Sequence, residues 1–251
     1  MKILGVIPAR YASTRFPGKP LAMIQGSTMI NRVYNQVLKA EKIDRVVVAT
    51  DDERIFDHVK EFGGQAIMTC KGHENGTSRC AEAVEILEKE NPGFRFDVVI
   101  NIQGDEPFID PFQIDKVAAI FEKNKTVQIG TLIKPIGNPK DLFNPNVVKA
   151  VPGKNRNVLY FSRQAIPFLR GVPEEKWLER AAYYKHIGIY GYRVDILGKL
   201  VRLHPGKLEK AEKLEQLRWL ENGYSVKAEI TDFESISVDT PEDLSKINNN
   251  R

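Results

Sequence analysis

The spacing of apolar residues in the first half of the chain alternates between two patterns. Short runs of consecutive aliphatic and β-branched residues are typical of buried strands, and apolar residues three and four positions apart are typical of helices. The predicted strands are Lys2–Pro8, Asp44–Thr50, Gln65–Thr69 and Asp97–Ile102. The predicted helices are Thr28–Ala40, a segment from the N-cap pair Asp51/Asp52 to about Phe62, and about Ser78–Glu90. Such alternation predicts parallel strands joined by crossovers, and therefore an open sheet covered by helices on both faces.

After about residue 126 the chain becomes richer in strands. The predicted strands here are Val127–Ile133, Val147–Val151, Val158–Phe161, His186–Tyr192 and Ser225–Ile230. A long amphipathic helix is predicted for roughly Leu208–Glu221, ending at the C-cap pair Asn222-Gly223, and a closing helix starts with Thr240 as N-cap and Pro241 at its first position. No linker, repeat or low-complexity segment interrupts the sequence. We therefore predict a single domain, 1–251, made of a first part of about 1–125 and a second part of about 126–251.

Composition narrows the class of protein. Apolar residues make up 42% of the chain and charged residues 28%, as in ordinary folded proteins. No apolar run approaches the ~20 residues needed to span a bilayer, and the first apolar run is too short for a signal peptide and leads to Arg10. We therefore expect a cytoplasmic protein without membrane insertion. The net charge of +4 comes from dispersed basic residues, so we expect no nucleic-acid partner.

Cys70 and Cys80 are the two cysteines of the chain. No metal-type spacing accompanies them. The sequence predicts two reduced, buried thiols.

The loop after the first strand carries the first candidate chemistry. In an open parallel sheet, ligands bind beyond the carboxyl ends of the strands, which is where residues 8–20 begin. Arg10, Arg15 and Lys19 lie in this loop with small residues and Gly18, which allow backbone N–H groups to approach phosphate oxygens. The loop matches neither the GxGxxG nor the GxxxxGK[ST] pattern, which disfavours a dinucleotide-binding protein or a P-loop kinase. A solvated basic loop is the alternative.

Acidic residues at two other strand ends suggest a metal site. Asp105 and Glu106 follow the strand that ends near Ile102, and Mg²⁺ prefers one or two carboxylates together with substrate phosphates. Asp105 is the better candidate ligand, although an acidic turn that caps the next element is the alternative. Asp239 precedes the closing helix, and by itself it reads as a plain helix start.

Further polar groups lie in apolar surroundings. The loop His73-Glu74-Asn75-Gly76-Thr77-Ser78-Arg79 opens a helix and suits an anion or a base edge, or simply a capped loop. Segments around Arg163, His186 and Glu215 have the composition of a polyol or carboxylate pocket. His186 alone would more often be a core histidine. Glu215 and Gln216 are adjacent, so both cannot face the core with the leucines of their predicted helix.

These segments together resemble one family, the cytidylyltransferases that activate 3-deoxy-manno-octulosonate (Kdo), also called CMP-Kdo synthetases. The resemblance runs through IPARYASTRFPGKPL, VVATDD, HENGTSR, NIQGDEP, FNPNVVKAV, YFSRQAIP, HIGIYGYR, KLEQLRWLENG and VDTPEDL. It implies an α/β fold: an open, mostly parallel Rossmann-like sheet of the nucleotidyltransferase type with helices on both faces and a strand-rich sugar-binding lobe. Residues of about 1–125 would bind the nucleotide, and about 126–251 would bind the sugar.

The resemblance also implies the reaction CTP + Kdo to CMP-Kdo + pyrophosphate, which serves lipopolysaccharide biosynthesis, with Mg²⁺ as cofactor and a homodimer as the assembly. Arg10, Lys19, Asp105 and Asp239 would be catalytic, and Asp105 and Asp239 would hold the metal. The residues implied to bind the nucleotide are Ala9, Arg10, Ser13, Lys19, Asn75, Arg79 and Gln103. Those implied to bind the sugar are Arg15, Arg163, His186, Tyr190, Glu215 and Gln216.

Two positions depart from the family pattern, which usually has serine at position 75 and an acid at position 78. This chain has Asn75 and Ser78, which leaves the nucleotide contacts and the sugar variant open. The alternatives are a cytidylyltransferase for another 2-keto sugar acid, such as an amino-Kdo or a sialic acid, and a non-catalytic nucleotide-sugar binding protein of the same fold.

Overall fold

The computed structural model describes residues 1–12, 16–234 and 236–249. Nine strands form one mixed sheet in the order β11-β7-β10-β6-β1-β4-β5, and β8 pairs with β10 and β9. The strands of the first half are β1 (Ile3–Ala9), β4 (Arg45–Thr50), β5 (Ala66–Met68) and β6 (Val98–Asn101). Those of the second half are β7 (Ile129–Pro135), β8 (Lys149–Pro152), β9 (Val158–Ser162), β10 (Tyr184–Arg193) and β11 (Val226–Ile230). A separate hairpin consists of β2 (Met23–Ile24) and β3 (Ser27–Thr28).

The two halves of the sheet are paired differently. In the first half β1 lies parallel to β4 and β6, and β4 lies parallel to β5. In the second half β10 runs antiparallel to β6, β7 and β8, and the last strand, β11, is parallel to β7. Because β10 joins both halves, the sheet is continuous from the parallel to the antiparallel part.

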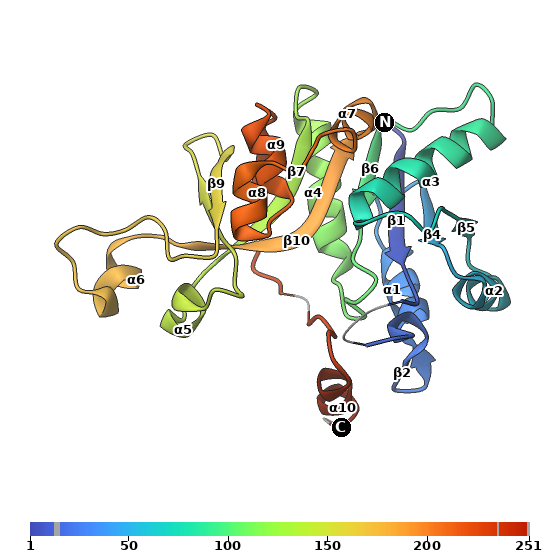
Figure 1. Ribbon diagram of the computed structural model, residues 1–251, viewed down its shortest axis with the longest axis horizontal. Helices are drawn as coiled ribbons and strands as arrows, with labels where there is room; N and C mark the ends of the chain where they lie inside the picture. The colour runs from blue at the N-terminus through green and yellow to red at the C-terminus, as the bar shows by residue number, and fades with distance from the viewer. Residues whose placement is uncertain (13–15, 235, 250–251) are drawn as a thin grey trace.

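Helices cover both faces, as the sequence predicts (Figure 1). The longer helices are α1 (Met29–Val37), α2 (Glu53–Glu61), α3 (Gly76–Glu90), α4 (Pro111–Lys123), α7 (Val194–Leu200) and α10 (Pro241–Asn249). Side chains of α1, α2 and α4 fill the core on one face of the sheet, and side chains of α3 and α7 fill the core on the other. The predicted fold class is confirmed, but α4 was not anticipated, although Asp110 caps it and Pro111 opens it.

The remaining helices are short, and two of them lie apart from the sheet. They are α5 (Pro139–Phe143), α6 (Trp177–Arg180), α8 (Lys207–Glu212), α9 (Gln216–Glu221) and the 3-10 turns at Lys19–Leu21 and Glu174–Lys176. Figure 1 shows α5 and α6 on an arm that extends away from the body of the sheet. This arm has a small core of its own around Trp177 and Tyr183.

The prediction of one long helix over Leu208–Glu221 is wrong. Two helices, α8 and α9, are separated at Lys213, which has a left-handed backbone with φ of 54°. The break turns the backbone carbonyls of Glu212 and Lys213 toward Arg163, and Glu209 of α8 forms an ion pair with Arg218 of α9 at 2.6 Å. Tertiary contacts therefore offset the cost of the break. The predicted end at Asn222-Gly223 is confirmed, with φ of 80° at Gly223.

Two smaller expectations have different outcomes. Both cysteines are free, but Cys70 is exposed, so the prediction of two buried thiols is wrong for it. Cys70 lies in the loop after the edge strand β5, whereas Cys80 lies on the core side of α3.

The predicted start of the closing helix is confirmed, because Thr240 Oγ1 accepts the N–H of Asp243 at 3.3 Å. No helix among the described residues is long and apolar enough to cross a bilayer.

Candidate active site

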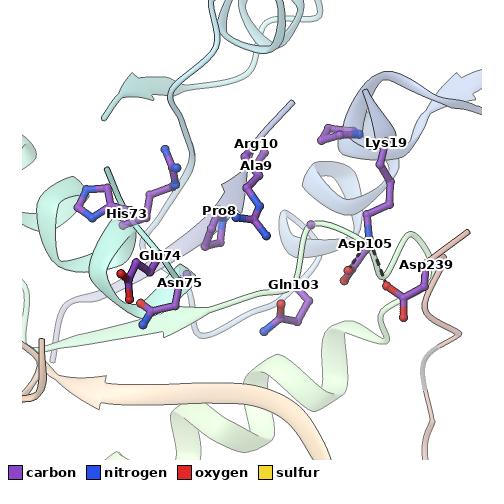
Figure 2. Close-up of a pocket in the computed structure, with 14 residues that line it drawn as sticks. Pro8, Ala9, Arg10, Lys19, His73, Glu74, Asn75, Gln103, Asp105 and Asp239 are labelled. Carbon is purple, nitrogen blue, oxygen red and sulfur yellow. Dashed lines mark hydrogen bonds and ion pairs between the residues drawn. The ribbon is translucent and has the colours of Figure 1, made fainter. Parts of the chain in front are cut away.

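A cavity of about 240 Å³ lies at the carboxyl ends of β1 and β6 (Figure 2). It is lined by Pro8, Ala9, Arg10, Lys19, Pro20, His73, Glu74, Asn75, Gly76, Arg79, Gln103, Gly104, Asp105 and Asp239. The parallel pairing of β1 with β6 brings the ends of these two strands together, as the sequence predicts. The described residues implied to be catalytic or to bind the nucleotide all lie in this wall, whereas Ser13 and Arg15 lie outside the described residues.

The close approach of two loops shapes the floor of the cavity. A Cβ atom at position 104 would lie 2.8 Å from the carbonyl oxygen of Pro8, so only glycine fits between β1 and the turn after β6. In the first loop, Gly18 has φ of 72° and its N–H donates to the carbonyl of Tyr11 at 2.9 Å. The left-handed backbone at Gly18 folds the loop back, and Lys19 follows at once.

Two carboxylates meet at the ammonium group of Lys19. Its Nζ lies 2.8 Å from Asp105 Oδ2 and 3.5 Å from Asp239 Oδ1, as the dashed lines in Figure 2 show. The N–H of Val238 donates to the backbone carbonyl of Asp105 at 2.9 Å, which fixes the segment before α10 against the turn after β6. Residues far apart in the sequence therefore place two acids at one point of the cavity.

This acid pair suits Mg²⁺ that is bound partly by the substrate phosphates, and it is too small a set of ligands to hold a metal ion by protein side chains alone. Among the described residues, no group of three or more His, Cys, Asp and Glu side chains could hold a metal ion. Mg²⁺ usually takes one or two carboxylates and completes its shell with substrate phosphates and water. Asp105 and Asp239 supply that number, and Lys19 neutralises part of their charge.

The opposite wall of the cavity is the loop before α3. Asn75 caps α3, because its Oδ1 accepts the N–H of Ser78 at 2.9 Å and the Ser78 hydroxyl at 2.8 Å. The two positions that depart from the family pattern therefore bond to each other. Serine at position 75 with an acid at position 78 is the pattern of a reciprocal capping box, and here a one-sided cap replaces it.

Arg79 and Gln103 line the cavity but already have protein partners. The Arg79 side chain is buried, and its guanidinium lies 3.0 Å from Asp51 Oδ2 and donates to Thr69 Oγ1 at 2.6 Å. Gln103 Nε2 donates to the carbonyl of Gly188 at 3.0 Å, in the stretch of β10 where the pairing register with β7 shifts. The sequence predicted Asp51 only as a helix cap. Its place in the VVATDD motif, which is part of the family resemblance, was the available signal that it contributes to the site.

The described residues among those implied to bind the sugar do not line this cavity. Arg163 donates from its guanidinium to the backbone carbonyls of Glu212, Pro145 and Lys213, at 2.6, 3.0 and 3.5 Å. Buried Lys149, which sequence reasoning did not single out, donates from its ammonium to the nearby carbonyls of Asn144 and Val147. These two cations hold the loop between α5 and β8.

His186 is a neutral side chain within an aromatic group. Its ring lies 5.2 Å from the Phe161 ring and 5.1 Å from the Tyr190 ring, and burial lowers its pKa to about 3. The Thr131 hydroxyl donates to the carbonyl of Ile189 at 2.8 Å, so its oxygen accepts a hydrogen bond from the Nε2–H of His186 at 3.2 Å. The other ring nitrogen, Nδ1, is then an acceptor.

Glu215 connects the sugar-side residues to the cavity wall. Thr77, in the first turn of α3, donates its hydroxyl to Glu215 Oε2 at 3.0 Å. Burial raises the pKa of Glu215 to about 7, and the Thr77 hydrogen bond offsets only part of that rise. Gln216 is buried and Glu215 is partly buried, so both neighbours are shielded from solvent. The buried hydroxyls of Tyr190 and Tyr192 have no hydrogen-bond partner among the described residues.

The known proteins most similar to this chain share one described activity. The profile of a family described as cytidylyltransferase matches residues 4–236. A protein of Bacteroides thetaiotaomicron named 3-deoxy-manno-octulosonate cytidylyltransferase is 55% identical over 97% of this chain and 96% of its own length. A protein of the same name from Parabacteroides distasonis is 52% identical over 98% of this chain and 96% of its own length. A solved structure described as CMP:2-keto-3-deoxy-manno-octonic acid synthetase complexed with CTP is 39% identical, covers 99% of this chain and 97% of its own, and has a TM-score of 0.89.

Proposed function

Since the chain belongs to the family of 3-deoxy-manno-octulosonate cytidylyltransferases, we propose that it joins CTP to Kdo to give CMP-Kdo and pyrophosphate. The observation that carries the proposal is the meeting of Lys19, Asp105 and Asp239 in one cavity at the carboxyl ends of parallel strands. A protein that only binds the nucleotide would have no need for two acids converging on the Lys19 ammonium. The product is an activated sugar for lipopolysaccharide biosynthesis.

The reaction is a displacement at phosphorus. The anomeric hydroxyl oxygen of Kdo forms a bond to the α-phosphorus of CTP, and the bond from that phosphorus to the oxygen bridging the β-phosphate breaks. The hydroxyl loses its proton to solvent water, and pyrophosphate leaves with the electron pair of the broken bond. Catalysis of such a step comes mainly from positioning and charge neutralisation, without a covalent bond to the protein.

The side chains of the cavity have distinct tasks in this scheme. Arg10 and Lys19 bind triphosphate oxygens and stabilise the charge on the departing pyrophosphate. Ala9, Asn75, Arg79 and Gln103 form the wall against which the nucleotide lies, and Asp51 orients Arg79. Asp105 and Asp239 would hold Mg²⁺, which would supply positive charge to neutralise phosphate oxygens and lower the pKa of the attacking hydroxyl. Lys19 holds the two acids together before the metal is bound.

The sugar side orients Kdo next to this cavity. Glu215 contacts the first turn of α3, which borders the cavity, and His186 and Tyr190 lie beside each other in the same region. His186 Nδ1 and the two tyrosine hydroxyls offer an acceptor and two donors for sugar hydroxyl groups. Arg163 supplies positive charge for the sugar carboxylate.

Release of pyrophosphate tests the proposal. We expect release when the protein is mixed with CTP, Mg²⁺ and Kdo, and far less with ATP, GTP or UTP or with a sialic acid as acceptor. Comparison with an amino-Kdo decides between the two closest sugars. Lys19→Ala should abolish the signal, and Lys154→Ala, an exposed lysine without contacts in the described chain, should not. Binding of CTP without release in the wild-type protein would identify a non-catalytic binding protein.

We also propose a homodimer in the cytoplasm, where CTP is made. The support for a dimer is the arm that carries α5 and α6, where Phe143 and Phe168 are 40% and 71% exposed while their rings contact Trp177. Exposed aromatic groups on a protruding arm are typical of an interface. Light scattering of the purified protein measures the mass in solution, and a monomer at micromolar concentration would contradict the dimer.

A further inference from the structure

The loop between β5 and α3 forms one wall of the cavity, yet little of it is held by backbone hydrogen bonds. His73, Glu74 and Asn75 face the cavity from this loop (Figure 2). Within the described chain, residues 70–75 make no backbone–backbone hydrogen bond outside regular helices and strands. Side chains must therefore hold this wall. Asn75 does so at the end that enters α3.

One carboxylate oxygen holds the other end. Glu82 Oε2, on the second turn of α3, accepts the backbone N–H of Cys70 at 2.8 Å and makes a short contact with His73 Nε2. The side chains of His73 and Glu82 are 18% and 23% exposed, so water screens the pair only in part. We name Cys70 N, His73 Nε2 and Glu82 Oε2 the loop clamp.

The Glu82 carboxyl group of the loop clamp is ionised near neutral pH. Burial raises the pKa of Glu82, but hydrogen bonds from His73 and from the backbone of Cys70 outweigh it and hold the pKa below its ordinary value. Hydrogen bonds to a charged acceptor are stronger than neutral ones, so the carboxylate fixes both loop positions firmly. The same carboxylate raises the pKa of the exposed Cys70 thiol.

We propose that Glu82 is a positioning residue for the nucleotide, because it holds the loop of residues 70–75 in the conformation that completes the CTP side of the cavity. Glu82 does not line the cavity, so its effect passes through His73 and the backbone of Cys70. The described sugar-side residues make no hydrogen bond to residues 70–75, and Glu215 bonds instead to Thr77 in the first turn of α3. Loss of the clamp should therefore weaken binding of CTP and leave binding of the sugar nearly unchanged. The inference rests on the proposed function for the identity of the nucleotide.

Calorimetry with CTP and no sugar tests the inference without requiring catalysis. Glu82→Ala should raise the Kd for CTP about tenfold, the effect of losing a hydrogen bond to a charged group. Glu82→Gln keeps an acceptor for the Cys70 N–H and should recover part of that loss. Glu85→Ala is the matched control, because Glu85 is exposed one turn along the same helix face of α3. A Kd for Glu82→Ala within twofold of the control would overturn the proposal.

Kinetics and thiol chemistry give two further readouts. In turnover, Glu82→Ala should raise the KM for CTP and leave the KM for Kdo within twofold, whereas equal rises would mean general damage to the fold and would contradict the proposal.

Cys80 is fully buried, so iodoacetamide reacts at Cys70. The pH midpoint of that reaction should fall in Glu82→Gln, because the carboxylate that raises the Cys70 pKa is gone. An unchanged midpoint would show that the clamp does not form in solution. If the wild-type protein binds CTP but releases no pyrophosphate, the proposed function fails while the binding and thiol tests still decide the role of Glu82.

Discussion

The proposed nucleotide side and the proposed sugar side of the molecule are built in different ways. On the nucleotide side, Arg10, Lys19 and Asp105 follow parallel strands and reach a common cavity because those strands end at the same edge of the sheet. On the sugar side, Arg163 and His186 come from antiparallel strands, and hydrogen bonds to backbone carbonyls or to Thr131 fix them individually. The strand order of the sheet brings the nucleotide-side residues together, whereas individual hydrogen bonds hold the sugar-side residues in place. Four predictions test this difference, starting with the largest effect.

Loss of either acid beside Lys19 should nearly abolish turnover. Asp105→Asn and Asp239→Asn keep the side-chain shape but remove the charge that Mg²⁺ requires, so kcat should fall on the order of 10³-fold. Pyrophosphate release at several Mg²⁺ concentrations measures the effect, and circular dichroism checks the fold. Glu242→Gln, an exposed acid near Asp239, is the control. If Asp239→Asn kept the wild-type dependence on Mg²⁺, Asp239 would have only a structural role at the start of α10.

Glu215 should make stability depend on pH at the junction of the two sides. Its pKa is about 7 in the folded protein, above the ordinary value of 4.5, so the folded state binds the proton more tightly. Its contribution is fully present below about pH 4.5 and is lost as the pH rises through 7. Glu215→Gln should therefore be more stable than wild type above pH 7, by at most about 3 kcal/mol, and the gain should vanish near pH 4.5. Urea unfolding at pH 5 and pH 8 measures this. The same pH dependence in both proteins would mean that Glu215 is well solvated.

Arg163→Leu should affect the sugar far more than the nucleotide. We expect the KM for Kdo to rise about tenfold, the effect of one lost charged hydrogen bond, and the KM for CTP to stay within twofold. The variant should also lose about 1 kcal/mol of unfolding free energy, since the partly buried carbonyl of Glu212 loses its donor. Arg163→Lys separates the two effects, because it keeps the charge without the planar set of donors. Equal changes in both KM values would place Arg163 outside the sugar site.

The smallest effect is expected at the break between α8 and α9. Lys213→Gly removes the cost of a left-handed backbone, which exceeds the added backbone entropy of glycine only slightly, so stability should rise by less than about 1 kcal/mol. Lys213→Ala retains the strain and should match wild type. Thermal unfolding of the three proteins gives the order. A loss of stability in Lys213→Gly would show that the lysine side chain contributes more than the strain costs.

The comparison also shows what the sequence could predict. Strand ends after apolar runs were placed correctly, so Arg10, Lys19 and Asp105 could be expected to meet. The break at Lys213 could not, because neither glycine nor proline marks it and the leucine spacing continues through it. The partners of Arg163 and His186 come from distant segments, for which a single sequence carries no local signal, and those of Glu82 come from the irregular loop before its helix. The convergence of Asp239 with Asp105 rested on the family resemblance, because Asp239 by itself has the pattern of a helix start.

The hydrogen bond from Thr77 to Glu215 crosses from the nucleotide wall to the sugar side. A ligand that strengthens or breaks this bond changes the free energy of the other ligand's site, and thermodynamic linkage makes that change symmetric. Whatever factor CTP imposes on the affinity for the sugar, the sugar imposes on the affinity for CTP. The bond between this hydroxyl and this carboxylate is therefore a contact through which binding of one substrate can change the affinity for the other, and the order in which they bind cannot alter the stability of the ternary complex.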